Sequence, residues 1–218
     1  MKLIAMIPAR MGSQRLARKN LAEIAGAPMI AHAVRKCLAV GAFDEIWINS
    51  EHPDFGLVAQ SEGVRFHQRP EALGDNNATS EQFVTEFLLA HPCDWLVQVH
   101  SIAPLLTVDD LRGFTDEVRA SPADAVFSVV DEQLECLFED QPVNFTFERK
   151  TNSQELTPVR RIVWAVTAWR SKTFLDAVAE GLCATYAGKR AFVSVDRMAG
   201  LVVKTRADLD LAAALFPA

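Results

Sequence analysis

The sequence lacks any long apolar run: none of its 218 residues belongs to a stretch of about 18 consecutive apolar residues, which a membrane-spanning helix needs. The apolar run near the start is too short for a signal peptide. Basic residues are fewer than acidic ones, 22 against 28, so the net charge is −6. A general nucleic-acid-binding surface usually has the opposite balance. We therefore expect a cytoplasmic protein that binds neither membranes nor nucleic acids.

Closely spaced cysteines and histidines are also missing. The four cysteines are scattered, none belongs to a Cys-x-x-Cys pair, and the five histidines show no metal-ligand spacing on one helix face. We expect reduced, half-buried thiols rather than a zinc site or a disulfide framework. Hydrophobic residues, by contrast, make up 50% of the chain, which is enough for a large core.

Apolar runs alternate along the chain with segments of helical periodicity. The runs are continuously apolar, which is typical of strands buried on both faces, and the alternation indicates helices on both sides of a parallel sheet. The sequence thus predicts an α/β fold with a mainly parallel, doubly wound, Rossmann-like sheet. We expect strands at 2–7, 45–49, 64–67, 94–99, 125–130, 162–169, near 192 and at 201–203. We expect helices at 28–41, 55–61, 79–90, from 107 onward, at 171–180 and at 206–215.

One segment does not fit this alternation. Residues 131–158 are polar, contain two prolines and show no clear period. We expect a single domain over 1–218, from which 131–158 departs as an excursion, such as a hairpin that meets a partner subunit.

Basic residues are concentrated directly after the first predicted strand. Four of the 22 lie between positions 10 and 19, namely Arg10, Arg15, Arg18 and Lys19. Ligands of parallel sheets bind beyond the carboxyl ends of the strands, and Arg and Lys form charge-assisted bonds to phosphate oxygens. Gly12 would let the backbone approach such a ligand. The loop matches neither the Walker nor the dinucleotide glycine pattern. It predicts a polyphosphate site; a solvated basic loop at a subunit contact is the alternative.

The loop also carries a family resemblance. It reads Ile-Pro-Ala-Arg-Met-Gly-Ser at 7–13 and Arg-Lys-Asn at 18–20. This pair of motifs resembles the signature of the sugar-acid cytidylyltransferases, a family that includes CMP-N-acylneuraminate synthetase and, more distantly, 3-deoxy-manno-octulosonate cytidylyltransferase. Weaker resemblances follow in the same order at 26–30, 43–50, 69–80, 104–111 and 154–165.

The resemblance implies that the anomeric hydroxyl of a nonulosonic-type sugar acid attacks the α-phosphate of CTP and releases pyrophosphate. Arg10 and Lys19 match the family's catalytic contacts to the triphosphate, where positioning and charge neutralisation do most of the work. The resemblance places the nucleotide against Gly12, Ser13, Arg15, Arg18, Asn20, Arg69 and Ser80. It places Gln154 toward the sugar acid, on an excursion that forms a homodimer in relatives.

Two departures from the family pattern lie where the acceptor would bind. His100 replaces a family glutamine and precedes Ile102 and Ala103, where the family has polar residues. His100 is predicted either to donate to the acceptor's carboxylate or to act as a base, the alternative being a polar residue at a strand end. Trp164 replaces a family glycine. Both changes predict a reshaped acceptor site.

A third departure concerns Mg²⁺, which the resemblance implies as the cofactor. The two aspartates that hold the metal in the family fall on Val202 and Lys204. Asp208 and Asp210 could take their place only if the alignment to the family motif were shifted along the chain. Their sequence context instead predicts the first turn of a helix, where acidic residues are favourable. The metal ligands are therefore unknown, and the ammonium of Lys204 is a possible substitute for the ion.

The sequence leaves three hypotheses about the function. The first is a cytidylyltransferase that uses CTP and a sugar acid. The second is a catalytically impaired relative that binds nucleotide or sugar acid as a partner or regulatory protein. The third is a nucleotidyltransferase with another base or acceptor.

Overall fold

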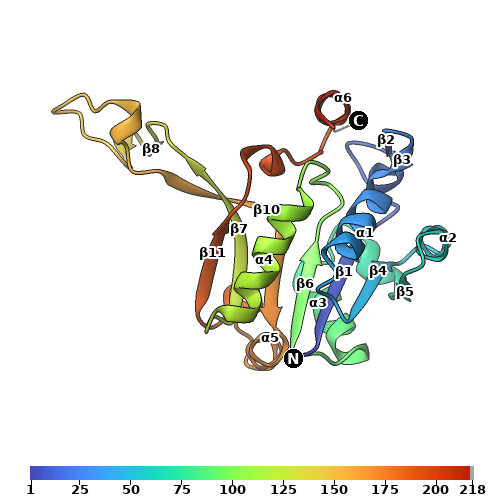
Figure 1. Ribbon diagram of the computed structural model, residues 1–218. Coiled ribbons are helices and arrows are strands. Elements are labelled where there is room, and N and C mark those ends of the chain that lie inside the picture. Colours follow the sequence, from blue (N-terminus) through green and yellow to red (C-terminus); the bar gives the residue numbers. More distant parts are fainter. Residues whose placement is uncertain (217–218) are drawn as a thin grey trace.

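The computed structural model describes residues 1–216, and its centre is a seven-stranded sheet in the order β11-β7-β10-β6-β1-β4-β5 (Figure 1). Every neighbouring pair is parallel except those of β10, which runs antiparallel to β6 and β7. The predicted mainly parallel α/β sheet is thus confirmed. The sheet strands are β1 (Leu3–Pro8), β4 (Glu45–Ser50), β5 (Arg65–Gln68), β6 (Trp95–Val99), β7 (Ala125–Glu132), β10 (Val159–Arg170) and β11 (Arg190–Ser194).

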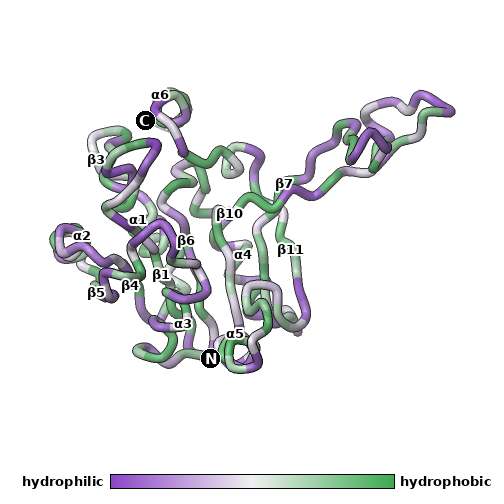
Figure 2. Tube along the Cα trace, turned by 180° about the vertical axis from the view of Figure 1, so that it is seen from behind, coloured by the Kyte–Doolittle hydropathy of each residue, from purple (hydrophilic) through white to green (hydrophobic). Residues whose placement is uncertain are grey.

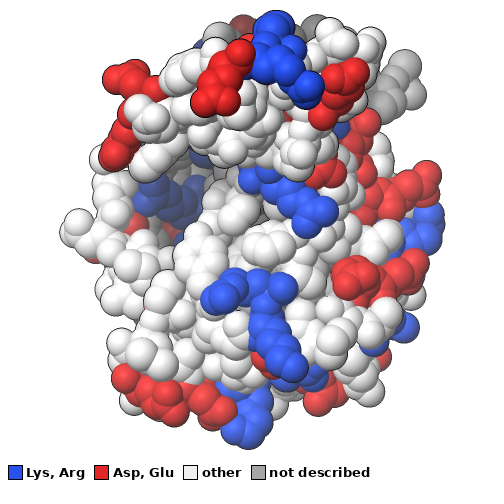
Figure 3. All heavy atoms as spheres, turned by 90° about the vertical axis from the view of Figure 1, so that its left-hand side faces the viewer, with Lys and Arg blue, Asp and Glu red and all other residues white. Residues whose placement is uncertain are grey.

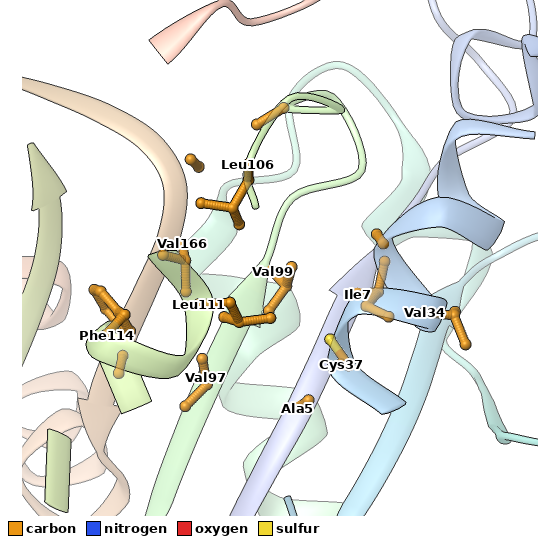
Figure 4. Close-up of a cluster of buried hydrophobic side chains, with 14 of the residues drawn as sticks. Ala5, Ile7, Val34, Cys37, Val97, Val99, Leu106, Leu111, Phe114 and Val166 are labelled. Carbon is orange, nitrogen blue, oxygen red and sulfur yellow. The ribbon is translucent and has the colours of Figure 1, made fainter. Parts of the chain in front are cut away.

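Helices cover both faces of the sheet, which explains why the strands are apolar without alternation. In β1, Ala5 and Ile7 belong to one buried cluster together with residues of α1, α2 and α4, whereas Ile4 and Met6 belong to another with residues of α3 and α5. Figure 4 shows part of the first cluster, with side chains of α4 and α1 packed against β1, β6 and β10. The helices are α1 (Met29–Val40), α2 (Asp54–Ser61), α3 (Ser80–Ala90), α4 (Val108–Ala120), α5 (Ser171–Ala179) and α6 (Arg206–Leu215).

Three helices begin with reciprocal side-chain caps. Thr79 caps α3 with Gln82, Thr107 caps α4 with Asp110, and Thr205 caps α6 in the same way. In each case the threonine hydroxyl accepts from a backbone N–H three residues on, and the partner side chain accepts from the threonine N–H. These caps fix where the helices start relative to the strand ends that precede them.

The predicted strand at 201–203 is wrong. A short 3-10 helix, η5 (Arg197–Gly200), ends there, and residues 201–203 are irregular. Val203 is fully buried, but against Ile24, Met29 and α6 rather than in the sheet. A short apolar run indicates burial without deciding between strand and loop. The β2 (Glu23–Ile24) and β3 (Ala27–Pro28) hairpin supplies the other side of this small cluster.

An arm leaves the body of the molecule between β7 and β10 (Figure 1). It contains the hairpin strands β8 (Leu137–Phe138) and β9 (Gln141–Pro142) and the 3-10 helix η3 (Ser153–Glu155). Asn144 holds the arm together, since its Nδ2 donates to the carbonyls of Leu134 and Thr157, each at 2.8 Å. Figure 2 shows that hydrophilic and hydrophobic residues alternate along the arm, in contrast to the largely hydrophobic central strands.

The cysteines are all unpaired: Cys37 is buried, Cys93 and Cys136 are half-buried and Cys183 is exposed.

Within residues 1–216, no helix combines the length and the apolar character needed to cross a membrane.

The difference between buried and exposed helical residues makes a simple prediction about stability. Leu111 on α4 is fully buried, whereas Leu57 on α2 is 67% exposed. Leu111→Ala removes buried methyl groups and leaves a cavity, so it should lower the free energy of unfolding by about 2–5 kcal/mol. Leu57→Ala is the matched control, because both positions are helical, and should change it by less than about 0.5 kcal/mol. Urea denaturation followed by circular dichroism measures both; equal losses would contradict this packing.

Candidate functional site

The loops that follow β1 and β6 enclose a cavity of about 230 Å³. The chain order of the sheet reverses between these neighbouring strands, which is where open α/β sheets bind ligands. Four cationic side chains line the cavity, and its lining within the described residues contains no carboxylate. The lining residues are Pro8, Ala9, Arg10, Ser13, Gln14, Arg15, Lys19, Asn20, Arg69, Phe83, His100, Ser101 and Ile102.

The pKa of Lys19 shows that positive charges converge in this cavity. Burial lowers the pKa of its ammonium, and the nearby charges of Arg15, Arg10 and Lys204 lower the pKa further. These cations come from the first loop and from the segment before α6, so tertiary structure brings them together. Because like charges that converge repel one another, the site favours a ligand that carries several negative charges.

Arg69 forms the floor of the cavity with its guanidinium, and only 4% of the residue is exposed. Its Nη2 donates to the carbonyl of Ala9 at 2.9 Å and its Nη1 donates to Asn49 Oδ1 at 3.2 Å. Glu51 forms an ion pair with it at 3.3 Å, and the guanidinium lies over the Phe83 ring, 4.8 Å from the centroid. Arg69 thereby joins the carboxyl ends of β1 and β4, while its Nε has no hydrogen-bond partner within residues 1–216.

Asn20 fastens the two loops to each other. This buried side chain donates through Nδ2 to the carbonyl of Arg10 at 3.2 Å, and its Oδ1 accepts from the Ser101 hydroxyl at 2.9 Å. Both ends of the amide therefore have partners in the protein. Asn20 positions the basic loop, and its predicted contact with the nucleotide stays a prediction.

A second cavity, of about 540 Å³, adjoins the first and shares His100 and Ile102 with it. It holds the three positions at which the sequence departs from the family pattern: His100, Trp164, and the pair formed by Val202 and Lys204. The lining residues are His100, Ile102, Arg161, Ile162, Val163, Trp164, Gly200, Val202, Lys204 and Asp208. Figure 3 shows acidic and basic side chains interspersed on the face below the arm, with Lys or Arg atoms inside a hollow there.

His100 stands between the two cavities. Burial, together with the charge of Lys19, lowers the pKa of its imidazole to about 4. The ring is therefore neutral at physiological pH. The Gln98 side-chain amide lies 2.7 Å from His100 Nε2, so that ring nitrogen has a partner within the protein. With so low a pKa the ring is a weak base, and its predicted role as a donor to the acceptor stays a prediction.

Four of the predicted site residues lie outside the lining of both cavities. Gly12 is exposed, and a Cβ added to it would meet nothing within 4 Å. Arg18 pairs with Asp54 at 3.4 Å and Ser80 is an exposed residue of α3. Gln154 lies on the arm, where its carbonyl accepts from Gln133. Their roles toward a ligand stay predictions.

Three further residues join the site without a signal in the sequence. Ser101 and Arg161 line the cavities, and Glu51 organises the first one. The carboxylate of Glu51 accepts from the Met11 N–H at 2.7 Å as well as pairing with Arg69. For Glu51 the sequence does hold one clue, because it lies two residues after the predicted strand at 45–49, where side chains reach the carboxyl edge of a sheet.

The residues present do not form a magnesium site. Among the described residues that line the two cavities, Asp208 is the single carboxylate. Its Oδ2 already accepts from the Lys204 N–H at 2.9 Å and from the Thr205 N–H and hydroxyl at 2.8 and 2.9 Å. It caps α6, as the sequence predicts. Residues 1–216 contain no group of three or more His, Cys, Asp or Glu placed to hold a metal ion.

The depressed pKa of His100 makes a prediction about pH. An unfolded histidine takes up its proton near pH 6.5, whereas folded His100 does so only near pH 4. Above pH 6.5 the ring is neutral in both the folded and the unfolded protein, so it does not oppose folding. As the pH falls from 6.5 toward 4, only the unfolded protein takes up this proton, and the free energy of unfolding decreases by up to about 3 kcal/mol. The free energy of unfolding should fall more steeply over this range for the wild type than for His100→Gln. Chemical denaturation at several pH values measures both slopes, and parallel curves would contradict the burial of the ring.

Comparison with known proteins supplies the family. A family model described as cytidylyltransferase matches residues 4–174. Pseudaminic acid cytidylyltransferase of Campylobacter jejuni is 28% identical over 189 residues, covering 81% of this chain and 82% of that protein. N-acylneuraminate cytidylyltransferase A of Danio rerio is 28% identical over 127 residues, 58% of this chain. The match spans only 30% of that longer protein.

Solved structures show the same fold at low sequence identity. A CMP:2-keto-3-deoxy-manno-octonic acid synthetase complexed with CTP has a TM-score of 0.74 and 18% identity, over 99% of this chain and 98% of that one. A 4-diphosphocytidyl-2C-methyl-D-erythritol synthase from Anaerococcus prevotii has a TM-score of 0.70 and 14% identity, over 98% and 97% of the two chains.

The match from residue 4 to residue 174 covers most of the chain, including the basic loop, β6 and β10. On this evidence, the chain belongs to the cytidylyltransferase family, whose members are nucleotidyltransferase enzymes.

Proposed function

We propose that the protein transfers CMP from CTP to a nonulosonic-type sugar acid and releases pyrophosphate. The observation that carries the proposal is the cavity after β1, which four cationic side chains line without a carboxylate. Its position within the family match supports a nucleoside triphosphate as the ligand. Relatives named for N-acylneuraminate, pseudaminic acid and 3-deoxy-manno-octulosonate support a sugar acid as the acceptor.

The two adjoining cavities fit the two substrates of this reaction. The triphosphate occupies the first cavity, where Arg10 and Lys19 neutralise its oxygens. The acceptor occupies the second cavity, so that its anomeric hydroxyl faces the α-phosphate at the shared border. A bond forms between that oxygen and the α-phosphorus, the bond to the bridging oxygen breaks, pyrophosphate leaves, and the hydroxyl proton passes to solvent. The protein contributes mainly positioning and charge neutralisation.

Lys204 replaces the metal in this proposal. Its charge is close enough to lower the pKa of Lys19, and its backbone N–H is held by the Asp208 cap. A single ammonium would neutralise the triphosphate less completely than a divalent ion does, so turnover should be slow and indifferent to Mg²⁺.

The second candidate is a relative that binds the nucleotide or the sugar acid without turnover. The observation that favours it is the same lack of a carboxylate pair at Val202 and Lys204. The two functions differ in one measurable property, because only the enzyme makes pyrophosphate.

The test combines binding and turnover. We expect CTP to bind more tightly than ATP, GTP or UTP in calorimetric titrations, and pyrophosphate to appear when N-acetylneuraminate or another nonulosonic acid is added. Lys19→Ala should lower kcat/KM by about 100-fold or more, since it removes a charge from the triphosphate site. Lys204→Ala should weaken CTP binding by about tenfold both in EDTA and in Mg²⁺.

Lys189→Ala is the control, since Lys189 is exposed and precedes β11 outside both cavities. CTP binding that is unchanged in Lys204→Ala would contradict the role of that lysine. Tight CTP binding without pyrophosphate would support the binding protein, and no binding of any nucleotide would contradict both functions.

We also propose that the protein is a homodimer in which the arm contacts the partner. Three large apolar side chains on the arm are strongly exposed in the single chain: Leu137 at 58%, Phe138 at 69% and Phe147 at 69%. Apolar surface of this kind is typical of an interface. Gln154 on the same arm would then lie close to the partner subunit.

Light scattering during gel filtration tests the dimer. The wild type should have about twice the chain mass of 24.1 kDa. Phe147→Glu should elute as a monomer, because a buried, unpaired carboxylate destabilises an interface. Leu57→Glu, which changes a 67% exposed residue of α2, is the control and should stay dimeric. A monomeric wild type would contradict the dimer.

A further inference from the structure

The second cavity differs in chemistry from the first, and this difference bears on the acceptor. We infer that the acceptor is a sugar acid in which acylamino and deoxy groups replace much of the hydroxyl content, rather than a polyhydroxylated sugar acid. The inference rests on the proposed function, since it assigns the acceptor to this cavity. It follows from what lines the 540 Å³ space and from which of those groups are still free to bind.

Four of the ten residues that line the cavity are aliphatic. Ile102 comes from the loop after β6, Ile162 and Val163 come from β10, and Val202 follows η5. None of these four side chains donates or accepts a hydrogen bond. They offer methyl and methylene contacts to a ligand.

Trp164 adds an aromatic wall that the fold holds in place. Its φ of 52° is in the left-handed region, which bulky residues rarely adopt, and it lies at the register shift of β10 between Ile162 and Thr167. Its ring lies 6.0 Å from that of Phe127 and 6.4 Å from that of Tyr186, both edge-on. A strained residue persists where its surroundings over-determine it, and such residues cluster at ligand sites.

Four polar or charged side chains also line the cavity, and several of their atoms already have partners. Arg161 donates through Nε and Nη2 to Glu132 Oε1, at 3.1 and 2.8 Å. Asp208 is engaged in the cap of α6, and His100 Nε2 is engaged by Gln98. What remains free is the Lys204 ammonium, the outer edge of Arg161 and one acceptor, Asp208 Oδ1, because the bonds of the cap all go to Oδ2. The two cationic groups match one carboxylate rather than a series of neutral hydroxyls.

This distribution sets the expected selectivity. A hydroxyl that is placed against Ile102, Val163 or Val202 leaves its water partners without gaining new ones, which weakens binding. A methyl or acyl group in the same place gains apolar contact instead. A single methyl group in an apolar pocket typically changes kcat/KM by about 10–200-fold. The carboxylate, which both kinds of acid share, contributes equally to each.

A competition experiment on the full chain tests the inference. Equimolar N-acetylneuraminate, with its hydroxylated side chain, and pseudaminic acid, with two acylamino groups and a terminal methyl, are offered together with CTP. The two CMP adducts are separated by chromatography. We expect the ratio of kcat/KM to favour pseudaminic acid by about tenfold or more.

A matched pair of variants shows whether the cavity wall is responsible. Val202→Thr keeps the volume of the side chain and adds a hydroxyl inside the cavity, so it should reduce the preference by about threefold or more. Val178→Thr on α5 makes the same change outside both cavities and should leave the ratio as in the wild type.

The outcomes separate this inference from the proposed function. Equal efficiency, or a preference for N-acetylneuraminate, would overturn the inference and leave the transferase intact. A preference that is unchanged in Val202→Thr would also overturn it. If neither acid receives CMP, the proposed function fails, and the assignment of the acceptor fails with it.

Discussion

The buried guanidinium of Arg69 is the interaction on which the geometry of the site depends. Strands β1 and β4 end side by side, and Arg69 binds the Ala9 carbonyl of one and Asn49 of the other. Without it, the Ala9 carbonyl, where the loop with the cations begins, and the buried Asn49 Oδ1 would each lose this donor. Glu51 balances its charge and also holds the Met11 N–H, so one ion pair orients both the floor and the start of the loop. Asn20 then closes the loop against Ser101.

This scaffold explains how an acidic chain holds a strongly basic cavity. The net charge of −6 is a sum over the whole chain, and acidic and basic side chains both lie on the face that Figure 3 shows. The cations of the cavity repel one another, which the lowered pKa of Lys19 reports. Such repulsion costs stability in the free protein and is relieved when a polyanion binds. The packed sheet beneath, covered by helices on both faces, supplies the stability that allows it.

The two cavities differ in the charge and polarity of their linings, and they meet at His100 and Ile102. Cationic and polar side chains line the first, whereas four aliphatic side chains and Trp164 line the second together with four polar or charged ones. His100 lies at the border with its ring neutral, so it adds no charge there. Lys204 extends the cationic character into the second cavity at a position where the resemblance implies a carboxylate. The first cavity thus favours a polyanion, and the proposed acceptor, an anion with apolar substituents, would lie beside it.

The sequence by itself determined the alternation of strands and helices and the position of the basic loop, because these depend on residues that are near one another in the chain. It also determined that Asp208 belongs to α6. Only the tertiary structure decided that Val203 is buried outside the sheet, that Arg18 pairs with Asp54 away from the cavities, and that Asn20 joins two loops. It also brought Arg161 and Lys204 to one cavity. These relations involve residues tens of positions apart, and their partners are set by how the strands are ordered in the sheet rather than by local pattern.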